Sequence, residues 1–180
     1  MSRIKITIEY DGSYYQGWQK QNSGKTVQDE IEKSLFKLFG RQIRIYVAGR
    51  TDAGVHALGQ VAHFDINQSK IDFKKISYAL NYFLKQNKNK ISILKSEKVE
   101  KSFNSRFSVR RKKYVYKILN RSTNSYLYEK KVWFIPTKLD LEKMIKASSF
   151  LVGKFDFNAF RSSHCQASQS LRSVEKIIIK

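Results

Sequence analysis

A short loop between two strand-like runs holds the residue types best suited to chemistry. It reads GRTDAGVH over residues 49–56 and lies between the runs 43–48 and 60–66. A carboxylate flanked by glycines at a strand end can approach a ligand more closely than a residue inside a regular strand. Asp52 is therefore the candidate for the chemistry. Because residues two apart in extended chain face the same way, Arg50 is expected beside it, where a guanidinium keeps a carboxylate ionised.

Two other interpretations of this loop stay open at the level of sequence. In the first, Asp52 bonds its own backbone in a turn and Arg50 is only a surface partner. In the second, the glycines cradle a phosphate. The loop, however, lacks the Lys-Ser/Thr pair of a P-loop, does not open a helix, and puts an acid where a phosphate would lie. His56 and His63 are expected to pack or to form hydrogen bonds.

Size and composition indicate an ordinary globular protein. The 180 residues are 41% hydrophobic and 13% aromatic, which suffices for a real core. No apolar run approaches bilayer length and the first ten residues alternate charges with isoleucines, so a soluble, cytoplasmic protein is expected. The single Cys165 excludes an internal disulfide. One cysteine with three scattered histidines lacks metal-ligand spacing, so no metal is expected.

The net charge favours a polyanionic partner. The chain carries a formal charge of +20, and residues 85–131 hold 15 Lys or Arg against 3 acids, a local charge of +12. Such a field, interleaved with aromatic residues, is typical of proteins that bind nucleic acid. Lysines outnumber arginines 25 to 10, so a compositional preference of the source is the alternative explanation for part of the excess.

The first half of the chain follows a recognisable order of strands and helices. Residues 3–10 alternate apolar and polar side chains and predict a strand. A capping box and a closing glycine bound a helix at about 26–39. Two strands flank the Asp52 loop, Asp72 then caps a second helix, and residues 90–99 supply a further strand. The order βαββαβ predicts the ferredoxin-like arrangement, an antiparallel sheet with two helices on one side.

The second half predicts a similar but incomplete round. Its expected elements are strands at 113–119 and 132–135, a helix at about 139–152, and a strand at 171–179. A helix and a strand that would complete a copy of the first half are missing. The predicted fold class is therefore α+β, with two related ferredoxin-like halves, 1–102 and 103–180, sharing a largely antiparallel sheet.

Several motifs, in order along essentially the whole chain, resemble those of the TruA-type tRNA pseudouridine synthases. The most specific is the string GRTDAGVHA, which begins at Gly49. The weaker ones are YDG at 10–12, GWQ at 17–19, TVQ at 26–28, Phe103-x-x-Arg106-Phe107, Tyr114-x-Tyr116, the loop 156–161 and Arg172. Individually these pieces are unspecific, but together and in this order they identify the family.

The resemblance implies an enzyme that isomerises uridine to pseudouridine at positions 38 to 40 of the tRNA anticodon stem-loop. Family members need no cofactor and act as homodimers whose two related halves form a continuous sheet. By the same resemblance Asp52 is the catalytic aspartate, Tyr114 stacks on the target uracil, and Arg50 assists extrusion of the nucleotide. The residues expected to contact RNA are Lys112, Lys113, Arg106 and Arg161.

The reaction suits these residue types on its own terms. The N-glycosidic bond must break, the uracil must turn, and C5 must join the sugar carbon without water intervening. A carboxylate serves either as a nucleophile or as a base, and the sequence does not distinguish the two. A uridine in a stem must first be flipped out, at a cost of about a few kcal/mol, and an aromatic platform such as Tyr114 offsets the lost stacking.

The chain departs from the family pattern in a few places. Asn104 and Phe155 stand where histidine is usual, and Lys112 and Lys113 stand where arginine is usual, which keeps charge but loses bidentate phosphate binding. Family members also continue past Lys180 through a segment that supplies a basic partner for the catalytic aspartate and part of the pocket wall. The alternative function is accordingly a truncated, non-catalytic remnant that grips a tRNA stem through residues 85–131.

Overall fold

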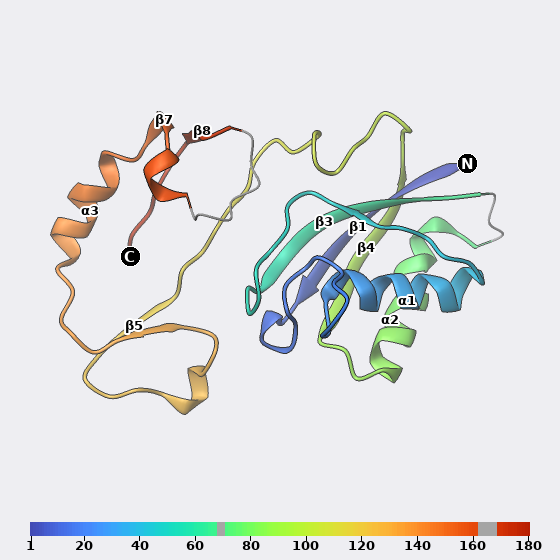
Figure 1. The fold of residues 1–180 in the computed structure, drawn as a ribbon, viewed down its shortest axis with the longest axis horizontal. Coiled ribbons are helices and arrows are strands. Elements are labelled where there is room, and N and C mark those ends of the chain that lie inside the picture. The colour runs from blue at the N-terminus through green and yellow to red at the C-terminus, as the bar shows by residue number, and fades with distance from the viewer. Residues whose placement is uncertain (68–70, 162–168) are drawn as a thin grey trace. The chain divides into compact units, whose positions relative to one another are not determined.

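The chain forms two compact units. A computed structural model describes residues 1–67, 71–161 and 169–180. Contacts within it group Met1–Val115 into one unit and Tyr116–Lys180 into the other, and Figure 1 shows the ribbon of both. These units meet between Val115 and Tyr116, and the division into halves 1–102 and 103–180 stays a prediction.

The first unit is built on a four-stranded antiparallel sheet. Its strands are β1 (Ser2–Tyr10), β2 (Tyr46–Val47), β3 (Ala57–Ile66) and β4 (Ile91–Val99), in the spatial order β2-β3-β1-β4. Two helices, α1 (Val27–Phe39) and α2 (Ile76–Gln86), contact each other and share one hydrophobic core with the sheet (Figure 1). The strand and helix order expected for this half is the observed one, with β2 shorter than the predicted run 43–48.

Local signals in the sequence explain where the helices begin and end. The Thr26 hydroxyl accepts a hydrogen bond from the Asp29 amide at 3.4 Å and caps α1. Gly40 ends that helix in the left-handed conformation, with φ of 68°. Asp72 accepts from the Lys74 amide at 3.0 Å and opens a 3₁₀ turn, Phe73–Lys75, that runs into α2. Both predicted helices of this half are therefore confirmed.

The two faces of the sheet differ in chemistry. On β1 the side chains of Ile4, Ile6 and Ile8 are fully buried in the core, and the alternating side chains point to the opposite, polar face. There the Arg3 guanidinium binds the Asp65 carboxylate through two hydrogen bonds of 2.8 Å. Lys5 pairs with Glu97 on β4 at 2.5 Å. The polar face is thus held together by ion pairs across neighbouring strands.

Replacing Asp65 with asparagine should remove part of the dependence of stability on acid pH. The Arg3 guanidinium, through its hydrogen bonds, holds the pKa of Asp65 below its usual value. A depressed carboxyl pKa stabilises the fold above the unfolded value of about 3.9, and this stabilisation is lost as pH falls through the folded value. We expect Asp65→Asn to cost about 1 kcal/mol at pH 7 and nearly nothing once the wild-type carboxyl is protonated. Urea unfolding at pH 7 and in acid measures the difference; equal losses at both would contradict it.

The second unit contains short strand pairs and one helix. Strand β5 (Ile118–Asn120) pairs in parallel with β6 (Trp133–Ile135), and β7 (Gly153–Asp156) pairs antiparallel with β8 (Leu171–Val174). Helix α3 (Leu141–Ser149) begins at Asp140, whose carboxylate accepts from the Lys143 amide at 3.0 Å. The predicted strand at 113–119 is wrong for most of its length, since pairing starts only at Ile118. The expected helix 139–152 and strand 171–179 are both too long.

The expected mixed class of helices with an antiparallel sheet is confirmed, whereas the division into two related ferredoxin-like halves stays a prediction. Among the helices of the described residues, none is long and apolar enough to cross a membrane. His164 and Cys165, which entered the expectations about metals and disulfides, lie outside the described residues.

Candidate active site

The Asp52 loop connects β2 to β3 and is held through the residues around the aspartate. The Trp18 amide donates to the Thr51 carbonyl at 2.9 Å, and the Thr51 hydroxyl lies 2.8 Å from the Tyr10 hydroxyl. The Val55 amide donates to the Asp52 carbonyl at 3.2 Å and closes a turn. The side chain of Asp52 itself is exposed, as is that of Arg50. The loop therefore presents the carboxylate outward from a backbone that is fixed on both sides.

A second loop, residues 11–19, supports the first one at close range. The Gly12 amide donates to Nδ1 of His56 at 3.2 Å, so His56 forms a hydrogen bond as expected. A Cβ on Gly12 would lie 2.1 Å from the Val55 carbonyl oxygen, and one on Gly17 would lie 2.6 Å from the Thr51 carbonyl oxygen. Glycine is thus required at both positions for the two backbones to touch. This support escaped the sequence analysis, although both glycines stand within its motifs.

Lys112 is brought to the start of the Asp52 loop. Its Nζ donates to the Ala48 carbonyl at 3.2 Å and lies so close to Gly49 that a Cβ there would approach it to 2.8 Å. Gln60 also contacts this point, since its side-chain amide donates to the Gly49 carbonyl at 2.7 Å. Tyr114, two residues after Lys112, is 74% exposed. Within the described residues it makes no hydrogen bond or ring contact, so its ring is available to a ligand.

The two arginines expected to contact RNA lie in different units. Arg106 is exposed and its guanidinium lies over the Phe107 ring at 5.6 Å. Asn104, one of the departures from the family pattern, accepts from the Arg106 amide at 2.9 Å and so forms a tight turn, a role that asparagine performs readily. Arg161 follows a 3₁₀ turn, Asn158–Phe160, in the second unit.

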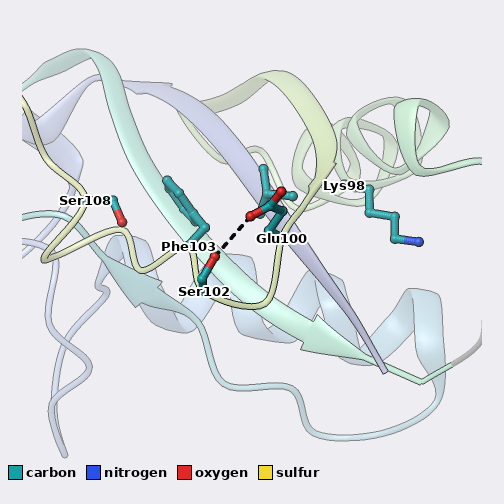
Figure 2. Close-up of a pocket in the computed structure, with 6 residues that line it drawn as sticks. Lys98, Glu100, Ser102, Phe103 and Ser108 are labelled. Carbon is teal, nitrogen blue, oxygen red and sulfur yellow. Dashed lines mark hydrogen bonds between the residues drawn. The ribbon is translucent and has the colours of Figure 1, made fainter.

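A shallow pocket lies at the opposite end of β1 from the Asp52 loop. Its lining residues are Lys98, Val99, Glu100, Ser102, Phe103 and Ser108 (Figure 2). Val99 pairs with Arg3 near the start of β1, whereas Thr51 contacts Tyr10 at its end. The strand rise places these points about 23 Å apart. This pocket is therefore separate from the candidate active site, which is an open loop on the surface of the first unit.

Comparisons with known proteins find a family and relatives that resemble this chain. The family described as tRNA pseudouridine synthase matches residues 6–108. The tRNA pseudouridine synthase A of Bartonella tribocorum is 46% identical over 180 residues, covering 100% of this chain and 72% of the relative. The corresponding values are 42% over 179 residues, 98% and 72% for the protein of Anaplasma phagocytophilum, and 44% over 178 residues, 99% and 72% for that of Neorickettsia sennetsu.

The matched range contains the Asp52 loop, both helices of the first unit and most of its sheet, but not Lys112 or Tyr114. It ends at Ser108, within the connector that follows β4. The chain belongs to the TruA-type tRNA pseudouridine synthases, a family of isomerases. The resemblance drawn from the motifs is confirmed at this level.

Proposed function

We propose that the chain converts uridine to pseudouridine in tRNA, at positions 38 to 40 of the anticodon stem-loop, with Asp52 as the catalytic group. The observation that carries the proposal is the geometry of the GRTDAGVHA loop. Its backbone is held through Thr51 and Val55 while the Asp52 carboxylate is exposed. A carboxylate that points outward from a fixed backbone suits a uridine that flips out of its RNA stem to reach the loop.

The reaction is an isomerisation and balances without a co-reactant. The bond from uracil N1 to the sugar C1′ breaks, a bond from C5 to C1′ forms, the C5 proton leaves and N1 ends protonated. Asp52 serves as nucleophile or as base in these steps. Tyr114 offers an exposed ring on which the flipped uracil stacks, and Arg50 assists the extrusion. Water is displaced from Asp52 only when the nucleotide covers it.

The segment 106–113 is proposed to bind the phosphate backbone. It carries Arg106, Arg110, Arg111, Lys112 and Lys113 without an acidic residue, and all five are exposed. Exposed cations at this density attract a polyanion and release its counterions on binding. Because Lys112 contacts the start of the Asp52 loop, RNA held by this segment would lie beside the carboxylate.

Neutralising Lys112 and Lys113 together to glutamine should weaken tRNA binding and flatten its salt dependence. We expect the slope of log affinity against log salt to fall by about one unit per lost phosphate contact. The matched control is another exposed pair of consecutive lysines, Lys74 and Lys75, which lies in the 3₁₀ turn before α2 and carries the same charge. Filter binding at several salt concentrations measures both slopes. An equal change in the two variants would place the RNA elsewhere.

The finer structural expectations belong to the same proposal. We propose two related ferredoxin-like halves. The first half is supported by the antiparallel order β2-β3-β1-β4 with α1 and α2 packed in one core. A cytoplasmic homodimer rests on the resemblance to the family. Light scattering of the purified chain at several concentrations tests the dimer, and a monomer at all concentrations would remove this part of the proposal.

The direct test is an assay of pseudouridine formation on an unmodified tRNA anticodon stem-loop. The expected result is pseudouridine at one or more of positions 38 to 40, identified by nuclease digestion and chromatography. No product at any uridine would overturn the proposed activity. Tight binding without product would instead favour the alternative function, a non-catalytic RNA-binding protein.

A further inference from the structure

The segment that follows β4 crosses the polar face of the sheet toward the Asp52 loop. We call residues 100–113 the strap. Near its start, Nη1 of Arg3 donates to the carbonyls of Lys101 and Phe103 at 2.7 and 2.8 Å. The same guanidinium binds Asp65 on β3, so the start of the strap is tied to the two central strands.

The middle of the strap is anchored by a buried pair, Ser105 and His63, which are 1% and 3% exposed. The Ser105 hydroxyl donates to the Tyr46 carbonyl on β2 at 2.8 Å and lies 2.8 Å from Nδ1 of His63 on β3. The Ser105 amide donates to the same Nδ1 at 3.2 Å. Ser105 therefore joins the strap to β2 and β3, the strands that flank the Asp52 loop.

The protonation state of His63 follows from this network. A ring nitrogen that accepts the Ser105 N–H carries no proton itself, so the imidazole is neutral with its proton on Nε2. Burial lowers the pKa of His63, and the positive charge of Arg3 lowers it further. The negative charge of Asp65 acts in the opposite direction but is the smallest of the three effects. The ring is also fixed in orientation, because it stacks on Tyr46 at 5.3 Å between ring centres.

The end of the strap reaches the candidate active site. Lys112 contacts the Ala48 carbonyl and Gly49, immediately after β2 and before Asp52. Tyr114 follows two residues later. Ser105 thus contacts the first residue of the short edge strand Tyr46–Val47, and Lys112 contacts the residue that directly follows this strand.

We propose that His63 is a positioning residue that acts through Ser105: the pair fixes the strap on the edge of the sheet, and thereby sets Lys112 and Tyr114 relative to Asp52. The inference rests on the proposed function for its catalytic consequence. Its structural part, the anchoring of the strap, stands independently. A displacement of about 1 Å at a reacting centre can cost 100-fold in rate, so an anchor of this kind has a large effect without touching the substrate.

Ser105→Ala tests the proposal, with Ser96→Ala as the matched control. Ser96 on β4 is equally buried, at 2% exposure, and its hydroxyl donates to the carbonyls of Phe73 and Lys74. It therefore holds the start of α2 and not the strap. We expect kcat to fall about tenfold in Ser105→Ala with a smaller change in KM, because the cations that bind RNA remain. Ser96→Ala should keep the wild-type kcat per folded molecule. Equal kcat in the two variants would overturn the proposal.

A pair of His63 variants provides a rescue test. An asparagine oxygen can replace Nδ1 as the acceptor for Ser105, whereas leucine offers none. His63→Asn should keep kcat within about threefold of the wild type, whereas His63→Leu, which leaves the Ser105 amide without its acceptor, should lower kcat at least about tenfold. Asparagine and leucine variants that lose the same activity would show that only the packing of the ring matters, which contradicts the proposal.

Hydrogen exchange separates failure of this inference from failure of the proposed function. Peptides covering 101–113 should exchange faster in Ser105→Ala than in wild type or Ser96→Ala, whether or not the chain forms pseudouridine. If the wild type is inactive but shows this exchange pattern, the proposed function is wrong and the proposed anchoring of the strap is retained. Strap exchange that is the same in all three proteins would remove the anchor, even with an active wild type.

Discussion

Asp52→Asn should abolish pseudouridine formation and leave tRNA affinity nearly unchanged. The amide keeps the size of the side chain but offers neither a nucleophile nor a base, so we expect a loss of at least about 100-fold. The side chain is exposed and the turn around it is closed by the Asp52 carbonyl, which the substitution retains. The free energy of unfolding should therefore change by no more than about 0.5 kcal/mol. Single-turnover assays on the stem-loop, with binding measured separately, check both parts.

Asp72→Asn is the matched control for this experiment. It removes the same negative charge from another exposed position, where the side chain caps the turn before α2 and asparagine caps equally well. We expect its turnover to equal that of the wild type. Substantial turnover by Asp52→Asn would remove the catalytic assignment. Equal losses in both variants would show that overall charge, and not the carboxylate of the loop, limits the rate.

Features with local causes were predictable from the sequence. The alternation of β1 follows directly from residues 3–10, and α1 lies between its cap Thr26 and the closing glycine Gly40. The loop that carries Asp52 was found in the same way, from glycines placed between two apolar runs. In each case the causes lie within a few neighbouring residues, which a single sequence displays.

Contacts between distant segments were not predictable in this way. Nothing near Ser105 indicates that it will meet His63, because the partners are separated by 42 positions and Ser105 stands at an unspecified position of the motif Phe103-x-x-Arg106-Phe107. The predicted strand at 113–119 failed for a related reason. Its alternation is genuine, but a strand needs a partner, and only Ile118–Asn120 finds one, in Trp133–Ile135.

The loop of residues 11–19 and the strap together explain how the exposed carboxylate of Asp52 can be held in a defined position. Gly17 lies against the backbone of Thr51, Asp52 and Ala53, and Lys112 contacts the start of the loop at Ala48 and Gly49, so the backbone of the loop is held at both places. Because the Asp52 side chain is exposed, few protein atoms surround it before the nucleotide binds. Precision must then come from packing beneath the loop, which makes the glycines of residues 11–19 a sensitive point.

Gly17→Ala should therefore damage both stability and activity. Gly17 has φ of 87°, and an added Cβ would lie 2.6 Å from the Thr51 carbonyl and 3.2 Å from the Asp52 carbonyl carbon. Both neighbours are backbone atoms that cannot swing aside. The left-handed conformation and the collision together should cost about 3 kcal/mol of folding free energy. Any folded molecules would hold Asp52 out of place, for a further loss of about 100-fold in kcat.

Gly40→Ala isolates the collision from the backbone strain. Gly40 has a similar φ of 68°, but a Cβ there would meet nothing within 4 Å. It should cost only about 1 kcal/mol, with kcat per folded molecule unchanged, because a Cβ at Gly40 would press on no part of the Asp52 loop. Urea unfolding and single-turnover assays at a temperature where both variants are folded give the comparison. If Gly17→Ala lost no more activity than Gly40→Ala, the packing beneath the loop would not position Asp52, and its precision would have to come from the bound RNA.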